Sequence, residues 1–316
     1  MGNYDQRFQE NGYRAFGLGI KSDFPLPEFM KTNSPLPHPD VTIVCGDLSG
    51  LWVKLSRQGR YYAAYDRFVL FHIREVGLFK VEKGCSIVVS PAPHADPGAV
   101  RLYLMGSCLG IILMQRHIFP LHGSALNIDG QVWAITGESG AGKSTLTAEL
   151  IRSGYRMLTD DVIAVSFNEQ GTPLITPSFP QQKLWKETLR HFGEMNRPYD
   201  PLYKRVSKFS VPVTEGYDRE THPLTGIFEL VKSGKNEPQL YPVSKIEEWQ
   251  LLFKHTYRGF FIPDMKLSEW HFRVVTRLAG QLNLYRLERP SGGVFTAQRL
   301  AEMMLNQIHD KITMRR

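Results

Sequence analysis

The residues most able to do chemistry stand together in the stretch Gly137-Glu-Ser-Gly-Ala-Gly-Lys-Ser144. It fills every position of the pattern G-x-x-x-x-G-K-[ST], in which backbone N–H groups surround phosphates, the lysine reaches the β/γ-phosphates and the hydroxyl binds Mg²⁺. A β-prone run, Gln131–Thr136, precedes it, and a helix-forming run, Thr145–Arg152, follows and is closed by Gly154. This order places the positive end of a helix at the phosphates. The sequence therefore predicts an ATP- and Mg²⁺-binding loop formed by Gly137, Glu138, Ser139, Gly140, Ala141, Gly142, Lys143, Ser144 and Thr145.

Two adjacent carboxylates, Asp160 and Asp161, come after the next β-prone run, Tyr155–Leu158. The helix after a phosphate loop leads away from the site and the following strand returns to it, so we expect this strand to end near the mouth of the loop. Phosphoryl transfer needs a metal that neutralises charge and a carboxylate that orients or deprotonates the attacking hydroxyl. We therefore predict that Asp161 is the general base and that Asp160 contacts a histidine or, with Ser144, the metal. The alternative is a turn with two solvated aspartates.

A single histidine, His122, precedes the phosphate loop in the run Pro120–Gly130, which we interpret as a turn, a strand and a hairpin turn. The hairpin makes this strand the neighbour of the strand that leads into the loop. A lone histidine near the start of a strand is often structural. Beside a carboxylate near the γ-phosphate it would instead tune that carboxylate. We therefore predict that His122 joins Asp161, Lys143 and Asp160 in the catalytic set.

Several basic residues are candidates to bind an acceptor's carboxylate or to stabilise the transferring phosphate. Some of them lie in the run Glu194–Val211, which has no clean periodicity and is predicted to be a mobile loop. Each of these side chains can equally be a solvated surface charge. Arg258 is the first choice because it directly follows a predicted helix that starts at Ser244 with a capping box to Glu247. The candidates are Lys183, Arg197, Lys204, Arg205 and Arg258.

The composition is ordinary for a globular protein, with 316 residues, of which 42% are hydrophobic and 22% charged. The net charge of +7 is dispersed and no nucleic-acid motif accompanies it, so we expect ATP as the anionic partner and no nucleic acid. Cys45, Cys85 and Cys108 form no C-x-x-C pair, which fits reduced thiols. The N-terminus has no signal-peptide pattern, and the apolar stretch Leu102–Met114 is too short to span a bilayer. We expect a cytoplasmic protein without a membrane partner.

The pattern of turns and apolar residues predicts two domains, residues 1–97 and 98–316. The first is β-rich and ends in a proline-broken linker, Ser90–Pro97. The second is an α/β domain built around the phosphate loop. The short β-prone runs of the first domain, arranged as in an antiparallel meander, are Val41–Val44, Leu51–Leu55, Tyr61–Ala64, Phe68–Ile73, Gly77–Val81 and Ser86–Val89.

Apolar periodicity predicts the main elements of the second domain. The expected helices are Ala99–His117, which should be largely buried, Gln181–Phe192, one that starts at Ser244, and one from Thr296 to His309. The side chains expected to face inward on the helix from Ser244 are Ile246, Trp249, Leu252 and Phe253. The expected strands after the carboxylate pair are Val162–Phe167, Leu224–Val231, Phe272–Thr276 and Leu282–Leu287.

Three segments together resemble the catalytic domain of HPr kinase/phosphorylase: Leu121–Gly130, Thr136–Ser144 and Gly154–Val162. The same spacing links the histidine, the phosphate loop and the aspartate pair in that family. The resemblance extends over about residues 100–167. It implies a P-loop α/β fold related to phosphoenolpyruvate carboxykinase, with His122, Lys143 and Asp161 as the catalytic set.

The chain also departs from that family. The HPr enzymes carry a glutamate followed by Arg-Gly-Leu-Gly, whereas the comparable place here is His222-Pro-Leu-Thr-Gly-Ile-Phe228. The sequence therefore identifies no glutamate for a second metal and gives no support for reverse phosphorylase activity. Phe16–Ile20, Phe24–Glu28 and Phe179–Trp185 instead resemble HPr-kinase-like proteins encoded with lasso-peptide biosynthesis machinery. That resemblance implies a kinase that phosphorylates the C-terminal serine of a ribosomally made precursor peptide.

Two other functions stay open at this point. The protein could be a serine kinase of an HPr-like carrier protein, or a non-catalytic nucleotide-binding scaffold or sensor. The carboxylate pair after the phosphate loop counts against the scaffold. The sequence does not decide the identity of the acceptor, the number of metal ions, the role of the N-terminal domain, or whether the chain forms a homo-oligomer.

Overall fold

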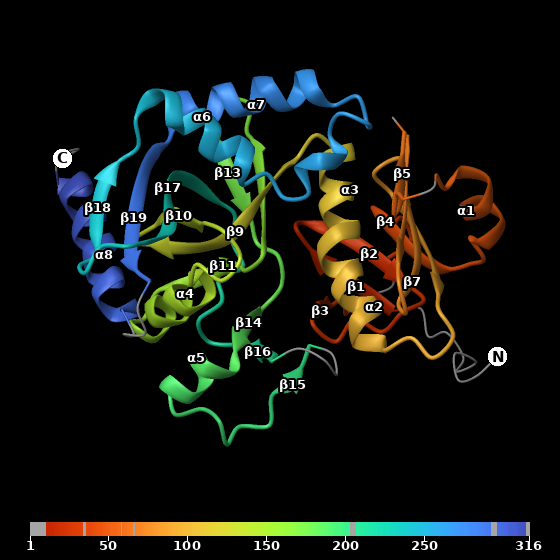
Figure 1. The fold of residues 1–316 in the computed structure, drawn as a ribbon, viewed down its shortest axis with the longest axis horizontal. Helices are drawn as coiled ribbons and strands as arrows, with labels where there is room; N and C mark the ends of the chain where they lie inside the picture. The colour runs from red at the N-terminus through yellow and green to blue at the C-terminus, as the bar shows by residue number, and fades with distance from the viewer. Residues whose placement is uncertain are drawn as a thin grey trace.

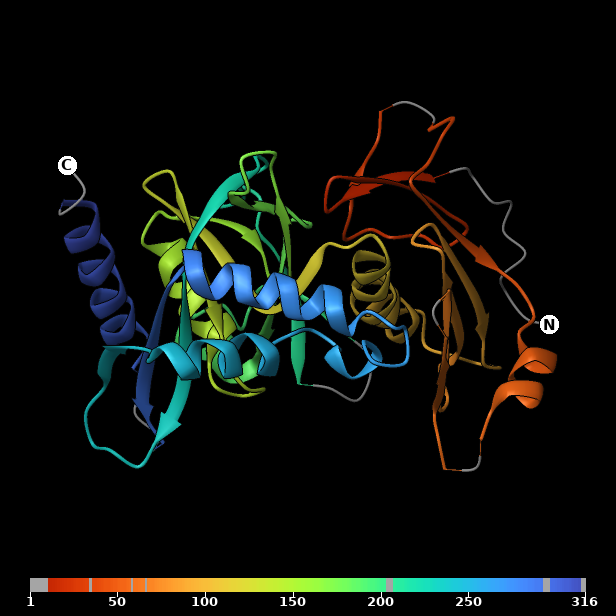
Figure 2. The same ribbon diagram turned by 90° about the horizontal axis from the view of Figure 1, so that it is seen from above.

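The computed structural model describes residues 11–33, 36–57, 59–65, 67–202, 207–291 and 296–313. Two β-sheet units lie on either side of one long helix (Figure 1). The second view shows the N-terminal unit beyond that helix and the strands and helices of the C-terminal unit on the other side (Figure 2). The fold is therefore mixed α/β, as the sequence predicts, with a β-rich N-terminal part.

The N-terminal unit is an eight-stranded sheet with the order β3-β1-β2-β4-β8-β7-β6-β5. The expected meander is present in part, because β5, β6, β7 and β8 pair with one another in antiparallel register. The expected strand Val41–Val44 departs from it, since β4 pairs in parallel with β2 and β8. In β7 the side chains alternate between buried and half-buried, as in a strand with one face on the core. The strands are β1 (Asn11–Ala15), β2 (Leu18–Ser22), β3 (Met30–Lys31), β4 (Val41–Cys45), β5 (Tyr62–Ala64), β6 (Phe68–Ile73), β7 (Gly77–Glu82) and β8 (Ser86–Pro91).

One expected strand of this unit is wrong. The run Leu51–Leu55 belongs to a helix, α1 (Ser49–Leu55). Leu51, Trp52 and Leu55 are half-buried while Val53 is 79% exposed, so the apolar side chains follow helical spacing and not the alternation of a strand.

The helix between the two units runs without a break from Pro97 to Gln115, as α2 (Pro97–Tyr103), the π-helical η1 (Leu104–Cys108) and α3 (Leu109–Gln115). It starts at Asp96, whose side chain accepts hydrogen bonds from the N–H groups of Gly98 and Ala99. The described part of the chain contains this one helix with the length and apolar composition of a membrane span, and 72% of its apolar window is buried. It is the buried helix expected from the sequence.

This helix shares its hydrophobic core with the N-terminal sheet. Leu104, Leu109 and Ile112 form one buried cluster with side chains such as Phe79 and Ile87 of the sheet. The core of the N-terminal unit thus continues beyond residue 97. The division of the chain at that residue stays a prediction.

The C-terminal unit contains a second eight-stranded sheet. Its strand order is β10-β9-β12-β13-β17-β19-β18, β11 pairs with β9, and β17 also pairs with β10. The pairing of β17 with both β13 and β10 closes five of these strands into a ring. The strands are β9 (Phe119–Ile128), β10 (Gln131–Thr136), β11 (Arg156–Thr159), β12 (Val162–Phe167), β13 (Pro173–Thr176), β17 (His222–Ser233), β18 (Gln239–Pro242) and β19 (Asn283–Pro290).

Helices cover both faces of the part of this sheet that carries the phosphate loop. Along β10, Val132 and Ala134 belong to one buried cluster, while Trp133 and Ile135 belong to another. The first cluster includes side chains of α6 (Lys245–Lys254) and α7 (Ser268–Gln281), and the second includes α4 (Lys143–Arg152) and α8 (Ala297–Thr313). Figure 1 shows α6 and α7 together on one side and α4 and α8 on the other. A strand buried on both sides holds the loop that follows it in a fixed place.

A small third sheet lies beside the phosphate loop. It has the order β14 (Gln181–Trp185), β16 (Lys208–Pro212) and β15 (Asp200–Pro201), and α5 (Lys186–His191) follows β14. The expected helix Gln181–Phe192 is thus a strand in its first half. Burial in this half alternates with the period of two that is typical of a strand, because Gln182 and Leu184 are buried whereas Lys183 and Trp185 point the other way. The expected mobile loop contains β15 and most of β16.

Two further expectations about helices and strands are wrong. The expected strand Phe272–Thr276 lies inside α7, where the buried side chains His271, Val274, Val275 and Leu278 follow helical spacing. The helix from Ser244 has its capping box as expected, but two of the side chains expected to face inward are exposed, Ile246 by 78% and Phe253 by 38%. The other elements expected from the sequence are present within a few residues of their bounds.

Candidate active site

The phosphate loop connects β10 to α4, as expected. At Gly137 the backbone has a positive φ of 146°, and a Cβ atom added there would lie 2.4 Å from the carbonyl oxygen of Leu230 in β17. Any other residue would push the loop away from the neighbouring strand, so this position requires glycine. Of the predicted loop residues, all except Ala141 line the two cavities at the site. The Ala141 side chain packs into the core beneath the loop.

Lys143 begins the helix after the loop, and its ammonium group lies on the loop itself. Its Nζ atom donates hydrogen bonds to the carbonyl oxygens of Gly137 (2.8 Å) and Glu138 (3.2 Å). Burial lowers the pKa of Lys143, while the nearby Asp160 and Asp161 act in the opposite direction. The lysine is therefore held inside the curve of the loop, where phosphates would bind.

Asp160 lies in the turn between β11 and β12 and is 5% exposed. Its Oδ1 atom accepts hydrogen bonds from the hydroxyls of Ser124 (2.6 Å) and Ser144 (3.4 Å), and its Oδ2 atom accepts one from the backbone N–H of Lys183 (3.0 Å). The turn thus brings this carboxylate to the hydroxyl of the phosphate loop. The sequence predicts this pairing of Ser144 with Asp160.

Asp161 is the next residue, and its side chain turns to a different set of partners. Its Oδ2 atom lies 2.6 Å from Nζ of Lys183, and its Oδ1 atom lies 3.6 Å from Nδ1 of His122. Its φ of 81° is rare for a residue other than glycine and is enriched among Asp and Asn. Burial would raise the pKa of Asp161, but the charge and hydrogen bond of Lys183, with His122 contributing when it is protonated, outweigh burial and hold the pKa far below its ordinary value. This carboxylate is ionised at neutral pH.

His122 is held in one orientation by backbone groups. Its Nδ1 atom donates a hydrogen bond to the backbone carbonyl oxygen of Asp161 (2.9 Å), and the backbone N–H of His122 donates one to the carbonyl oxygen of His255 (2.7 Å). Burial lowers the pKa of His122, although Asp161 raises it in part. A neutral imidazole that donates from Nδ1 keeps Nε2 as an acceptor.

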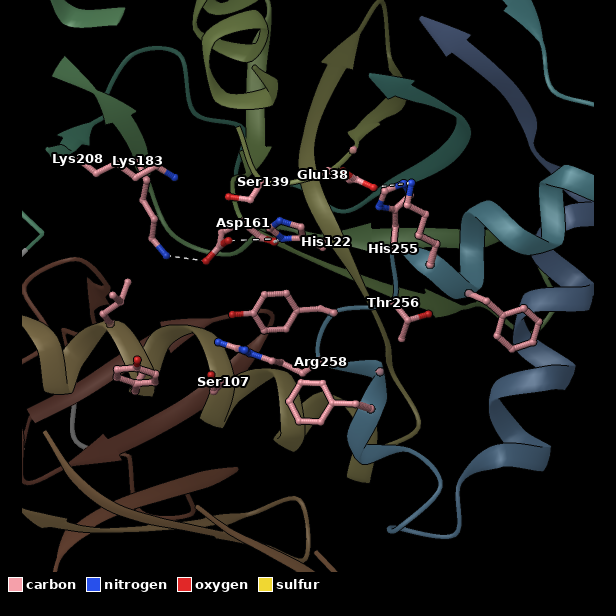
Figure 3. A pocket seen from close by; sticks show the side chains of 18 of the residues that line it. Ser107, His122, Glu138, Ser139, Asp161, Lys183, Lys208, His255, Thr256 and Arg258 are labelled. Carbon is pink, nitrogen blue, oxygen red and sulfur yellow. Dashed lines mark hydrogen bonds and ion pairs between the residues drawn. The ribbon is translucent and has the colours of Figure 1, made fainter. Parts of the chain in front are cut away.

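Two adjoining cavities meet at these side chains. The larger, of about 820 Å³, extends toward the long helix and includes Ser107 and Arg258. The smaller, of about 300 Å³, follows the phosphate loop to Thr145. His122, Asp161, Lys183 and Lys208 line both of them, and Figure 3 shows Asp161 between the side chains of Lys183 and His122. A carboxylate at this junction can face a phosphate on one side and an acceptor on the other.

The predicted basic residues fall into three groups. Lys183 and Arg258 line the larger cavity. Arg197 does not, because it lines a separate cavity beside the N-terminal unit. Lys204 and Arg205 lie outside the described residues.

The structure also brings in residues that the sequence analysis did not select. Tyr257 lies under His122, with ring centroids 5.6 Å apart, and its backbone N–H donates to the carbonyl oxygen of Pro120. Lys208 reaches both cavities from β16. Arg289 in β19 donates from Nε to the carbonyl oxygen of Ala141 and so braces the phosphate loop. Pairings between distant segments place these residues, and no local pattern marks them.

A buried ion-pair network lies behind the phosphate loop. Glu229 stands beside Thr136 in the parallel pairing of β17 with β10. Its carboxylate oxygens lie 2.9 Å from Nε2 of His255 and 3.0 Å from Nε of Arg286. Lys254 reaches from the end of α6 to Glu138 of the loop, at 3.0 Å. The network therefore ties the helix that precedes Arg258 to the strand behind the loop.

We expect Glu229→Gln to destabilise the fold at neutral pH by about 2 kcal/mol, because it removes the carboxylate that pairs with Arg286 and is hydrogen-bonded to the buried His255, although Arg286 keeps its pairing with Glu247. Burial would raise the pKa of Glu229, but His255 and Arg286 lower it from 4.5 to about 2. A depressed carboxylate pKa stabilises the fold above pH 4.5, and this contribution is lost as the pH falls toward 2. The difference in unfolding free energy between wild type and variant should therefore shrink over that range. Urea unfolding at pH 7 and pH 3 measures it, with the exposed Glu302→Gln as control; a constant difference would contradict the prediction.

The donors at the loop fit Mg²⁺. Mg²⁺ prefers oxygen ligands and is usually held by one or two side chains together with substrate phosphates. The Ser144 hydroxyl and the Asp160 carboxylate are such oxygens and lie 3.4 Å apart. Within the described ranges there is no group of three or more His, Cys, Asp or Glu side chains that could hold a metal ion.

Comparison with known proteins agrees with this geometry. Residues 117–184 match the family described as "HPr Serine kinase C-terminal domain". Over 213 residues the chain is 33% identical to the HPr kinase/phosphorylase of Nitrosomonas europaea, covering 58% of this chain and 65% of that protein. Over 114 residues it is 31% identical to that of Streptococcus equinus, covering 36% of this chain and 32% of that protein. The chain thus spans less than two thirds of the length of these curated relatives.

Among solved structures, the chain is similar to the HPr(Ser) kinase/phosphatase of Coxiella burnetii, with 16% identity and a TM-score of 0.34, covering 61% of this chain and 98% of that one. The family match contains His122, the phosphate loop and the aspartate pair, which are the residues that the structure brings together. Residues 117–184, which contain the phosphate loop, are therefore similar to the HPr serine kinase C-terminal domain.

Proposed function

We propose that the protein is an ATP- and Mg²⁺-dependent kinase that phosphorylates a serine hydroxyl, and that this serine is the C-terminal residue of a lasso-peptide precursor. The observation that carries the proposal is the position of Asp161 at the junction of the phosphate-loop cavity and the larger cavity. A carboxylate at such a junction is where phosphoryl transfer needs its base. The names of the relatives in the HPr kinase/phosphorylase family support the same chemistry.

In the proposed reaction the serine oxygen attacks the γ-phosphorus of ATP. The new P–O bond forms as the bond between the γ-phosphorus and the β–γ bridging oxygen breaks, and ADP leaves. Asp161 accepts the hydroxyl proton. Lys143 exchanges its carbonyl partners in the loop for phosphate oxygens, and Lys183 lies where it can neutralise charge on the transferred group. When bound, Mg²⁺ at Ser144 and Asp160 neutralises phosphate charge.

The larger cavity has the charge expected for an acceptor that ends in a carboxylate. Lys183, Lys208 and Arg258 line it, and they outnumber the lining carboxylates of Asp161 and Glu138. The Nε atom of Arg258 is buried and has no hydrogen-bond partner in the part of the chain that the structure describes. An unpaired buried donor costs free energy, which a substrate carboxylate would recover. A C-terminal serine presents a carboxylate next to its hydroxyl.

The proposal is tested by mass spectrometry after incubation with ATP, Mg²⁺ and peptides that end in serine. We expect a gain of one phosphate, about 80 Da, on the terminal residue. The same peptides with an amidated terminus should react about tenfold more slowly, because they lack the charge that pairs with Arg258. Equal rates for acid and amide would remove the terminal carboxylate from the proposal.

The second candidate function is phosphorylation of a serine in an HPr-like carrier protein, which the names of the matched relatives favour. Incubation with HPr in parallel distinguishes the two acceptors. Phosphate on HPr and on no peptide would replace the peptide proposal with the carrier proposal. The cytoplasmic location expected from the sequence is compatible with both candidate functions.

A further inference from the structure

A separate cavity of about 320 Å³ adjoins the larger cavity of the active site. The two share the side chains of Leu102 in α2 and Leu202 after β15 as a common wall. The walls of this adjoining cavity come from the N-terminal unit, from α2 and from the segment before β15, and they include Pro27, Arg101 and Tyr199. A chain that leaves the active site past Leu102 and Leu202 would enter it.

Glu28 gives this adjoining cavity an incomplete hydrogen-bond site. The residue is 9% exposed, and its Oε1 atom accepts a hydrogen bond from Nε of Arg101 at 2.9 Å. Its Oε2 atom is buried and has no partner among the residues that the structure describes. An unsatisfied buried acceptor costs free energy, more so when it is charged. Glu28 therefore favours a ligand that supplies a donor.

The neighbourhood of Glu28 defines the kind of donor. Arg101 already neutralises the carboxylate, so a neutral donor fits better than a further cation. Arg197 and Asp200 also line the cavity, one charge of each sign, so the walls carry no net charge beyond the Glu28–Arg101 pair. Much of the remaining wall consists of proline and tyrosine side chains, namely Pro27, Pro198, Tyr199, Pro201 and Pro212. A backbone N–H, a hydroxyl or a side-chain amide of a peptide has the required chemistry.

We propose that this adjoining cavity binds the part of the acceptor peptide that precedes the phosphorylated serine, and that Glu28 accepts a hydrogen bond from it. The inference rests on the proposed function, since it takes the acceptor to be a peptide. It gives a role to the segment Phe24–Glu28, which lies far from the phosphate loop in sequence. The N-terminal unit thereby contributes to acceptor recognition through a residue that holds no ATP.

The test uses serine-ended peptides of increasing length, taken from one sequence, with full-length protein, ATP and Mg²⁺. In wild type the KM should fall about tenfold once the peptide is long enough to pass Leu102 and Leu202, while kcat stays the same. Glu28→Gln should lose this gain in KM for the long peptides. Pro198 is an exposed residue in the wall of the adjoining cavity, and the bulky ring of Pro198→Trp would fill the cavity. This variant should therefore lose the gain in KM as well. The matched control is Glu269→Gln, an exposed glutamate on α7, and thermal unfolding verifies that each variant is folded.

Two outcomes would overturn the inference while the kinase proposal stands: a KM that does not depend on length, or the same length dependence in Glu28→Gln and Pro198→Trp. If no peptide is phosphorylated, the proposal of a peptide kinase fails. The inference about the adjoining cavity is then tested by peptide binding alone. Fluorescence anisotropy of a labelled peptide that ends in alanine then gives the affinity. Affinity that falls about tenfold in Glu28→Gln supports the adjoining cavity, and affinity that is absent or unchanged rejects it.

Discussion

Replacing Asp161 by asparagine is expected to lower kcat about 10³-fold, within the range usual for loss of a general base. The substitution suits the site because asparagine has nearly the shape of aspartate and tolerates the positive φ of 81° at this position. It removes the charge that faces Lys183 and His122 but leaves the phosphate loop unchanged. Transfer of phosphate to a serine-ended peptide measures kcat, and the affinity for ATP should stay within about threefold of wild type.

The control for this variant is Asp310→Asn, an exposed aspartate on α8, which should keep full activity. A rate in Asp161→Asn equal to that of wild type would contradict the base assignment. If Asp161→Asn binds ATP and retains every cellular function, the result would favour the non-catalytic scaffold. The two aspartates would then serve only to form the turn between β11 and β12.

Replacing Lys143 by methionine is expected to lower kcat/KM for ATP by about 10²- to 10³-fold, because the charge that meets the β- and γ-phosphates is lost. Methionine keeps the length and the apolar stem of the side chain. Since Lys143 also donates to the carbonyl oxygens of Gly137 and Glu138 in the loop, its loss removes these two hydrogen bonds. Titration with a fluorescent ATP analogue separates weaker binding from slower transfer.

The matched control is Lys54→Met on α1, a lysine that is exposed and remote from the cavities. ATP affinity and turnover that both survive in Lys143→Met would show that phosphates do not bind in this loop. Such a result would reject the ATP site itself, whichever acceptor the protein uses.

Local patterns in the sequence predict which residues the structure brings together around the phosphate loop. The phosphate loop needs only its glycines, its lysine and a flanking strand and helix, and these all lie within one continuous stretch. The proximity of Asp160 to Ser144 follows from simple topology, since a strand that returns beside β9 must end near the loop. The hairpin at Asp129 places His122 beside the strand that enters the loop.

The errors arise where tertiary contacts decide the conformation. The stretch from Gln181 to Phe192 carries apolar residues that suit a helix and a strand alike, and pairing with β16 selects the strand for its first half. Phe272–Thr276 is rich in residues that favour strands, but packing of Val275 and Leu278 against the sheet selects a helix. Glu229, Lys208 and Glu28 carry no local signal, because their partners lie far away along the chain.

The contact between Tyr257 and the long helix bears on how the space in front of Asp161 can change shape. A Cβ atom on Gly106 would lie 2.6 Å from the Tyr257 hydroxyl oxygen, and one on Gly110 would lie 2.8 Å from its ring. Glycine at these two positions thus allows the long helix to lie directly against Tyr257. A side chain at either glycine would have to displace Tyr257, and one at Gly106 would also lie 3.9 Å from Oδ2 of Asp161. The shape of the space in front of Asp161 can therefore change through this helix alone, while the sequence of the phosphate loop stays the same.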